Sequence, residues 1–272
     1  MRFASVMHGE TPLAVAIEGD HAVPLVGISE LGVDTPLSVL VGASLDRAGA
    51  LPLDAIRHRP LVPNPRKVIC VGLNYVEHIN ESGSQVPDYP VFFTKFANSL
   101  IGAFDDIVLP PESKAIDYEG ELTVVIGEQA RRVSRADALN YVAGVTVGND
   151  VSMRDYQNKT HQWLQGKAWE AVTPIGPQLV TLDEVGDLSA LTLRTTVNGS
   201  VEQEASTSLM IFDVPTLVST LSEFTTLEPG DLILTGTPSG VGFRREPPLL
   251  LGAGSVVIVE IDGVGRIENS CV

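Results

Sequence analysis

The fold is decided by residues 117–127, which read DYEGELTVVIG. Two glutamates, Glu119 and Glu121, stand two positions apart and lead directly into the apolar run 122–126. In a strand, side chains two positions apart point to the same face of the sheet. Neighbouring carboxylates repel each other, and burying them is costly unless a cation compensates. The stretch predicts a strand that begins at a pair of acids, which is either a cation site or, more often for this spacing alone, a solvated acidic edge.

A third acid, Asp150, ends another apolar run. Residues 142–147 read VAGVTV and predict a second buried strand, which stops at Gly148-Asn149-Asp150. An Asp at the end of a strand beside the glutamate pair would complete three oxygen ligands, a set that suits Mg²⁺, Mn²⁺ or Ca²⁺. Zinc would require histidines and cysteines, which are few and scattered here. The alternative is that Asp150 caps a short helix beginning at residue 151.

The overall charge limits the classes of partner. The 272 residues include 34 Asp plus Glu and 18 Lys plus Arg, which gives a formal net charge of −16. So acidic a chain is not expected to bind nucleic acid or anionic membranes, because both require clustered Lys and Arg. The sequence has no signal-peptide pattern and no apolar run near the roughly 20 residues of a transmembrane helix. Cys70 and Cys271 make no disulfide framework, so we expect a cytoplasmic protein.

Three prolines between residues 60 and 65 mark the clearest boundary, because proline favours extended backbone. We expect a small β-rich N-terminal domain over residues 1–63 and a larger catalytic domain over residues 66–272. Asn198-Gly199 predicts a hairpin turn, and apolar residues at helical spacing predict a helix over 214–224. The other apolar runs are short and strand-like, at 67–72, 91–93, 191–197, 232–235 and 256–261. The predicted fold class is α+β, mostly β, rather than alternating βα.

Three basic residues, Arg154, Lys167 and Lys95, stand in otherwise apolar or acidic surroundings. Gln157 follows Arg154 by three positions, and Arg154 follows Asp150 by four, so on a helical turn the three would share a face. Arg154 is expected either to bind a substrate carboxylate or to hold Asp150. Lys167 lies among apolar and aromatic neighbours, and Lys95 breaks an apolar strand. Taken singly, each base is more often a structural ion-pair partner than a catalytic group.

His78 and Glu81 are three positions apart in a segment that is expected to be helical, residues 74–81. On a helix they are neighbours, and a carboxylate beside an imidazole raises its basicity, as a general base acting on water requires. A solvated pair is the alternative. The loop 234–242, LTGTPSGVG, lacks the pattern of a P-loop or a dinucleotide fold. Its backbone amides, at Gly236 for example, and the Thr237 hydroxyl are instead candidates for holding a small oxyanion.

Several motifs occur together in an order that resembles the fumarylacetoacetate hydrolase family, over roughly residues 66–272. They are Gly72-Leu73-Asn74-Tyr75 with His78, Asp117-Tyr118-Glu119-Gly120-Glu121-Leu122, Gly148-Asn149-Asp150-Val151-Ser152 with Arg154-Asp155, Gly166-Lys167, Met210-Ile211-Phe212, LEPGD at 227–231 and TGTPSGVG at 235–242. The resemblance implies a mixed β-roll, a divalent metal site and a homodimer. It favours the cation site over the solvated edge.

The resemblance also implies a role for each matching residue. Metal ligation, of Mg²⁺ or Mn²⁺ with Ca²⁺ as a substitute, is expected of Glu119, Glu121 and Asp150. Catalysis is expected of Lys167, which would stabilise an enolate, and of the pair His78 and Glu81 on a mobile lid. Substrate binding is expected of Arg154, Gln157, Thr237, Lys95 and Gly236.

The activity implied is that of a metal-dependent hydrolase that cleaves a C–C bond in a 2,4-dioxo acid. The substrate would be a small anionic 2-oxo acid such as fumarylpyruvate or another acylpyruvate, as in aromatic catabolism. Cleavage would pass through a pyruvate enolate held by the metal and Lys167. Two alternatives stay open: an oxaloacetate decarboxylase or 2-hydroxyhepta-2,4-diene-1,7-dioate isomerase on the same site, and a non-catalytic metabolite-binding protein on the same fold.

Overall fold

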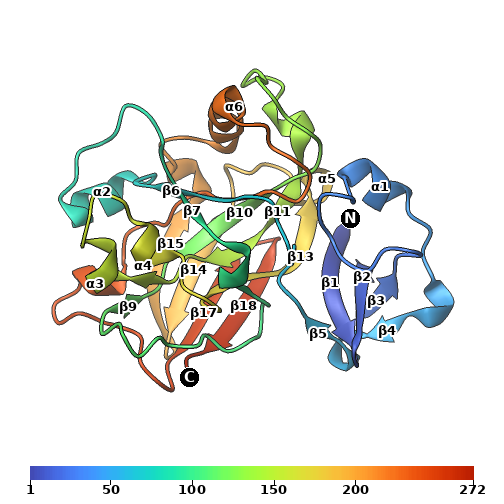
Figure 1. Ribbon diagram of the computed structural model, residues 1–272, viewed down its shortest axis with the longest axis horizontal. Coiled ribbons are helices and arrows are strands. Elements are labelled where there is room, and N and C mark those ends of the chain that lie inside the picture. The colour runs from blue at the N-terminus through green and yellow to red at the C-terminus, as the bar shows by residue number, and fades with distance from the viewer.

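The computed structural model describes residues 1–272, apart from the side chain of Ser82, and is built around one large sheet (Figure 1). Neighbouring strands follow the order β4-β3-β2-β1-β13-β11-β10-β16-β6-β7, with β5 beside β1 and β8 beside β13. In that order their bounds are Leu51–Pro52, His21–Pro24, Thr11–Glu18, Arg2–His8, Thr173–Thr181, Val142–Asn149, Gly120–Ile126, Leu232–Leu234, Val68–Gly72 and Val91–Lys95, with Arg57–His58 for β5 and Leu100–Ile101 for β8. The predicted α+β, mostly β class is confirmed.

A second sheet of four strands lies beside the first. Its order is β15-β14-β17-β18, with bounds Ser200–Ser206, Thr192–Val197, Val256–Ile261 and Gly265–Ser270. The predicted hairpin turn joins β14 to β15, and both Asn198 and Gly199 have positive φ there, as such tight turns require. Side chains from both sheets, such as Val145 and Val259, form one apolar cluster. The space between the sheets is therefore the main core.

Helices are few and mostly short. They are α1 (Leu37–Gly42), α2 (Val76–Ser82), α3 (Arg154–Gln157), α4 (Leu164–Lys167), α5 (Leu182–Val185) and α6 (Val214–Phe224). The helix predicted over 214–224 is confirmed as α6. Its N-terminus is capped by the Asp213 carboxylate, which accepts a hydrogen bond from the Thr216 amide at 3.0 Å. No helix in the described part of the chain is long and apolar enough to cross a membrane.

The N-terminal strands extend the large sheet instead of forming a sheet of their own. Arg2 and Phe3 of β1 pair with Val180 and Leu179 of β13. Phe3 and Leu61 also pack in one apolar cluster that includes Ile175 and Leu234 of the larger part. The division into domains at residues 63–66 stays a prediction, and the structure adds that the two parts share a sheet and a core.

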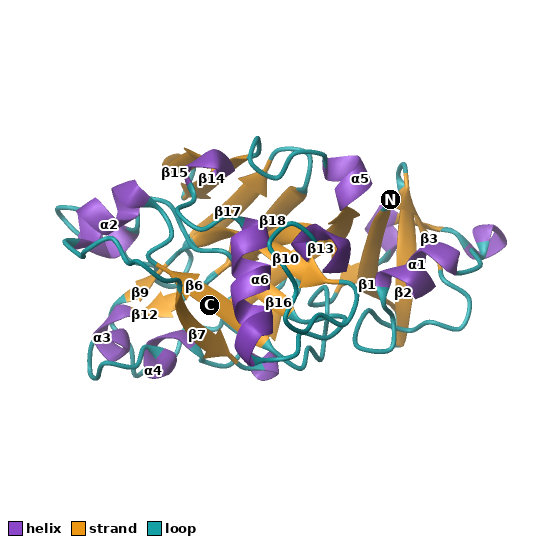
Figure 2. Cartoon of the chain, turned by 90° about the horizontal axis from the view of Figure 1, so that it is seen from above, coloured by secondary structure: helices purple, strands orange, loops and turns teal.

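Three short helices gather at the end of the molecule away from β1–β3. Figure 2 shows α2, α3 and α4 together at this end, and α4 packs against β7 and β12 (Ser152–Met153), which pairs with β9 (Ile116–Asp117). The base of α2 is held by Asn74, whose side chain donates to the Thr235 carbonyl at 2.7 Å. The same end of the molecule carries the segments that hold the predicted site residues.

Candidate active site

Strand register brings the three predicted metal ligands together. β10 and β11 pair antiparallel with Glu121 opposite Gly148, so Asp150, just beyond β11, lies beside Glu119. The Asp150 amide donates to the Glu119 carbonyl at 2.8 Å. One carboxylate oxygen from each of Glu119, Glu121 and Asp150 lies within 4.8 Å of the other two. All three side chains are buried, which shows that the solvated acidic edge is wrong.

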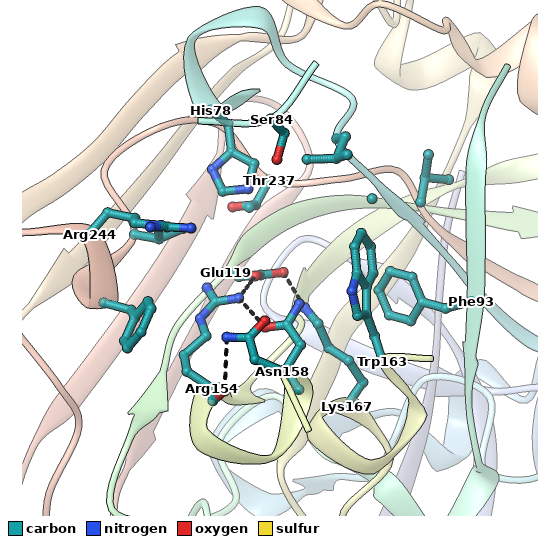
Figure 3. Close-up of a pocket in the computed structure, with 16 residues that line it drawn as sticks. His78, Ser84, Phe93, Glu119, Arg154, Asn158, Trp163, Lys167, Thr237 and Arg244 are labelled. Carbon is teal, nitrogen blue, oxygen red and sulfur yellow. Dashed lines mark hydrogen bonds and ion pairs between the residues drawn. The ribbon is translucent and has the colours of Figure 1, made fainter. Parts of the chain in front are cut away.

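Two lysines and an arginine surround this triad. Figure 3 shows two of these three bases, Arg154 and Lys167, beside Glu119. Lys167 Nζ lies 2.7 Å from Glu119 Oε2 and 3.0 Å from Asp150 Oδ2. Lys95 Nζ lies 2.6 Å from Asp150 Oδ1, and Arg154 Nη1 lies 2.6 Å from Glu119 Oε1. Asp150 therefore pairs with two lysines and caps no helix.

The charges around the triad act differently on its members. Burial alone would raise the pKa of Glu119, but the Lys167 ammonium and the Arg154 guanidinium overcome burial and hold that pKa at about 2. Burial also disfavours the charged form of Lys167, yet Asp150 and Glu119 raise the pKa of its ammonium above the ordinary value. Glu119 is thus ionised, and Lys167 protonated, at neutral pH.

Glu121 is the member of the triad without a counter-charge. Its Oε2 accepts a hydrogen bond from the Gly236 amide at 2.7 Å, while its Oε1 is buried and has no hydrogen-bond partner among the described residues. Burial and the neighbouring charges of Asp150 and Glu119 raise its pKa well above the ordinary value. A buried carboxylate oxygen left without a partner, beside two more carboxylates, is the environment that a hard divalent cation fits. The three acids can therefore hold a divalent metal ion.

Arg154 contacts partners other than the predicted one. Its Nε donates to Asp117 Oδ2 at 2.8 Å, and its Nη1 contacts Glu119 and donates to Gln157 Oε1 at 2.9 Å. Of its two expected roles, holding Asp150 is wrong, because α3 begins at Arg154 and Asp150 lies upstream of β12, outside that helix. Sequence reasoning also missed Asp117, although its position in the decisive acidic stretch was a signal.

Lys95 and Gly236 contact carboxylates of the triad. The Lys95 ammonium donates to Asp150, and the Gly236 amide donates to Glu121. Neither residue is among those that line the cavity, as is also true of Glu121 and Asp150. Both residues hold carboxylates in place, and substrate binding by them stays a prediction.

A cavity of about 140 Å³ opens in front of Glu119 (Figure 3). The predicted site residues on its wall are His78, Glu119, Arg154, Gln157, Lys167 and Thr237. His78 Nδ1 lies 3.3 Å from Glu81 Oε2, and Glu81 in turn accepts a hydrogen bond from the Gly240 amide at 3.1 Å. The predicted neighbours on α2 are therefore in contact, and the loop after β16 holds the pair at the cavity.

The Thr237 hydroxyl reaches the cavity but is already engaged. It donates to the Gly120 carbonyl at 3.0 Å and accepts from Gln203 Nε2 at 2.8 Å. Donation from this hydroxyl to a substrate carboxylate would require breaking its bond to Gly120. No sequence pattern pointed to Gln203, which comes from β15 in the second sheet.

Further cavity residues were not predicted from sequence. They are Val71, Gly72, Leu73, Ser84, Phe93, Asn158, Trp163, Val241, Phe243 and Arg244. Trp163 and Phe93 meet edge to face with ring centroids 5.6 Å apart, and Lys167 Nζ lies 5.1 Å from the Phe93 centroid. The tryptophan in an otherwise polar insert was the available signal for this aromatic wall.

Comparisons with known proteins point to one family. The family model for the fumarylacetoacetate hydrolase C-terminal domain matches residues 67–272. A Rattus norvegicus protein named "Oxaloacetate tautomerase Fahd2a, mitochondrial" is 43% identical over 256 residues, covering 93% of this chain and 82% of the relative. A Dictyostelium discoideum protein named "Fumarylacetoacetate hydrolase domain-containing protein 2 homolog" is 49% identical over 217 residues, covering 76% and 71%.

Two solved structures superimpose on this chain over its whole length. A fumarylacetoacetate hydrolase from Exiguobacterium antarcticum superimposes with a TM-score of 0.88 at 35% identity, covering 100% of this chain and 99% of that one. A 2-hydroxyhepta-2,4-diene-1,7-dioate isomerase from Mycobacterium marinum gives 0.83 at 34% identity, covering 100% and 98%. Proteins that share this fold are thus named for different reactions, one as a hydrolase and one as an isomerase.

Proposed function

This chain belongs to the fumarylacetoacetate hydrolase family, and from that premise we propose that it interconverts the enol and keto forms of oxaloacetate. The name of the Rattus norvegicus relative supports the choice of substrate and reaction. The expected cleavage of an acylpyruvate has no such support from the relatives. The oxaloacetate alternative is therefore preferred, with its chemistry changed from decarboxylation to tautomerisation.

The observation that carries the proposal is the set of charged groups at the cavity, where two cations stand beside three buried carboxylates that fit a divalent metal ion. Lys167 and Arg154 place positive charge beside the triad, and His78 supplies an imidazole that can give or take a proton.

The reaction needs no second reactant. When the enol becomes the ketone, one proton leaves the oxygen on C2 and another is added to C3, as the C2–C3 double bond becomes a C2–oxygen double bond. A divalent cation bound by Glu119, Glu121 and Asp150 would supply Lewis acidity next to the 2-oxo acid end of the substrate. The Lys167 ammonium faces the same end and stabilises negative charge that develops on the C2 oxygen.

His78 is the residue that we assign to proton transfer at C3. Its imidazole lines the cavity, and Glu81 orients the ring through Nδ1, which leaves Nε2 for the substrate. An imidazole can take up a proton and return it near neutral pH, so one residue serves both directions of the reaction. The enol hydroxyl proton leaves to solvent.

The His78–Glu81 contact also favours a second candidate function, hydrolysis of a 2,4-dioxo acid. The same pair, at 3.3 Å, could activate a water for attack on a distal carbonyl, with Lys167 stabilising the enolate that departs. This candidate lacks the support that the name of the Rattus norvegicus relative gives to oxaloacetate. Decarboxylation of oxaloacetate and isomerisation of a dienedioate use an enolate as well and are distinguished by their products.

A side-by-side assay tests the proposal. The protein with Mg²⁺ or Mn²⁺ is given enol-oxaloacetate, acetylpyruvate, fumarylpyruvate and 2-hydroxyhepta-2,4-diene-1,7-dioate, and the products are analysed. We expect faster conversion of enol-oxaloacetate to the ketone without release of carbon dioxide. Release of pyruvate from an acylpyruvate, with no effect on oxaloacetate, would establish the second candidate instead.

We carry three further expectations forward as proposals. The cytoplasmic location expected from the two cysteines stays a proposal, although the Rattus norvegicus relative is named as mitochondrial, and cell fractionation tests it. The homodimer implied by the family resemblance is tested by analytical ultracentrifugation. A net charge of −16 supports the absence of nucleic-acid and anionic-membrane partners.

A further inference from the structure

Arg244 extends toward the cavity from the wall opposite Trp163 (Figure 3). It is the last residue of a one-turn 3-10 helix, Gly242–Arg244, and its guanidinium lies 5.6 Å from the Phe243 ring centroid. We propose that Arg244 binds the second carboxylate of the substrate and so selects dicarboxylates over monocarboxylates. The inference rests on the proposed function, since it names the group that recognises the far end of oxaloacetate.

The charges around the triad are the first argument. The structure gathers four carboxylates, of Asp117, Glu119, Glu121 and Asp150, and three cations, of Lys95, Arg154 and Lys167. Those three cations form ion pairs with carboxylates of the site. The second carboxylate of a dicarboxylate needs a further cationic group away from the triad, and Arg244 is a basic side chain on the opposite wall of the cavity.

Asp117 holds the backbone that carries Arg244. Asp117 accepts hydrogen bonds from the Gly242 amide at 2.8 Å and from the Phe243 amide at 3.2 Å, while its Oδ2 also accepts from Arg154 Nε. One buried carboxylate therefore sets the position of both arginines, one at each side of the cavity. Gly242 cannot be replaced without disturbance, because a Cβ there would lie 1.9 Å from the Leu249 carbonyl oxygen.

Arg244 and Lys167 line the same cavity from different sides. Figure 3 shows Lys167 and Trp163 on one side of Glu119 and Arg244 on the other, with His78 above Glu119. A 2-oxo acid end bound beside Glu119 and Lys167 would direct the rest of the substrate toward His78 and Arg244. An arginine suits this role because its planar fork binds both oxygens of a carboxylate.

Binding of two unreactive ligands tests the inference directly. Malate and lactate share the 2-hydroxy acid end, but malate alone has a second carboxylate. Calorimetry with the Mg²⁺-loaded protein measures both dissociation constants for the wild type, Arg244→Gln and Arg244→Lys. We expect Arg244→Gln to weaken malate binding about 10–100-fold, the effect of losing a hydrogen-bonded charge, and to leave lactate unchanged. Arg244→Lys should restore part of the loss.

A remote arginine provides the matched control. Arg266→Gln removes the same charge from β18, where Arg266 pairs with Glu260 and Glu268 on the surface, and it should leave both dissociation constants unchanged. Equal losses for malate and lactate in Arg244→Gln, no loss for either, or a wild type that binds malate no tighter than lactate overturn the inference. A selective loss of malate in a protein that does not act on oxaloacetate would uphold the inference and reject the proposed function.

Discussion

The floor and the rim of the cavity are built from different kinds of structure. The floor, which consists of Glu119, Glu121, Asp150, Lys167 and Arg154, is carried by β10, the end of β11 and the turns α3 and α4. Four of its side chains form ion pairs, Glu121 accepts a hydrogen bond from the Gly236 amide, and all five are buried. The rim consists of His78, Glu81, Trp163 and Arg244. It stands on short helices and loops, and His78 and Glu81 are 13% and 22% exposed.

This difference suggests a division of labour. A preorganised floor stabilises negative charge on a 2-oxo acid whichever reaction follows, be it tautomerisation, hydrolysis or isomerisation. Residues on loops can change between relatives without disturbing the sheet. The solved relatives fit this view, because proteins named as a hydrolase and as an isomerase share the fold at TM-scores of 0.88 and 0.83. We therefore expect floor substitutions to abolish all reactions and rim substitutions to change which reaction or substrate is preferred.

The largest effect is expected from Glu121→Ala in the floor. This change removes the carboxylate whose orphaned oxygen fits a cation, so metal binding should be lost together with at least about 10³-fold in turnover. Titration calorimetry with Mg²⁺ and an assay on enol-oxaloacetate measure the two effects. Glu268→Gln, on the surface of β18, is the control that should change neither. Wild-type affinity for Mg²⁺ in Glu121→Ala would exclude this residue as a ligand.

Lys167→Met should separate charge stabilisation from metal binding. The ammonium stands between two carboxylates of the triad, so its removal should lower kcat by about 10²–10³-fold. The affinity for Mg²⁺ should stay the same or rise, because a neighbouring positive charge is lost. Unchanged kcat, or a loss of activity fully explained by weaker metal binding, contradicts a direct role for Lys167.

On the rim, His78→Ala should lower kcat by about 10²-fold or more while metal affinity is retained. Glu81→Gln should have a smaller effect in the same direction, because it weakens the orientation of the ring. Glu77→Gln is the matched control: Glu77 lies on the same helix and contacts Ser239 at 3.3 Å, not His78. Equal turnover by His78→Ala and the wild type would remove His78 from the mechanism.

The smallest effect is on stability and concerns Glu121 and Glu119, whose pKa values move in opposite directions. The folded protein without metal holds a proton on Glu121 more tightly than the unfolded chain does, so its free energy of unfolding should fall as pH rises above about 4.5. Glu119 has the opposite sign and stabilises the fold above about 4.5, a contribution lost between pH 4.5 and 2. Each unit of pKa difference corresponds to about 1.4 kcal/mol.

Urea unfolding between pH 5 and 8 in the presence of a chelator measures the Glu121 contribution. The wild type should lose stability toward higher pH, and Glu121→Gln should lack that loss because the amide cannot ionise. Saturating Mg²⁺ should remove the loss in the wild type. The same pH dependence in both proteins would show that Glu121 is not the group responsible.

Local sequence patterns predicted the strands and helices that are themselves long and apolar or that show a clear helical period. β10, β11 and α6 are long apolar or periodic segments, and each was expected close to where it lies. β13 was missed because Pro174, Gly176 and Pro177 disguise a strand that β1 and β11 stabilise from either side. Tertiary pairing overrides weak local preference there.

The site shows the same limit. The spacing of Glu119, Glu121 and Asp150 left both a cation site and a solvated acidic edge open, and the family resemblance favoured the cation site. The contact between Arg154 and Asp117 was missed because 37 positions of chain separate the two residues. Arg244 was equally hidden, because its place on the rim depends on how Asp117 holds the loop that carries it.

Titration of the metal-free wild type with Mn²⁺, followed by calorimetry and by the electron paramagnetic resonance of the free ion, tests the central claim most directly. The account predicts one Mn²⁺ bound per chain, displaced by Mg²⁺ and bound more weakly as pH falls, because protons compete for Glu121. A chain that binds no divalent cation, or binds it equally well after Glu121→Gln, contradicts the assignment of the buried triad.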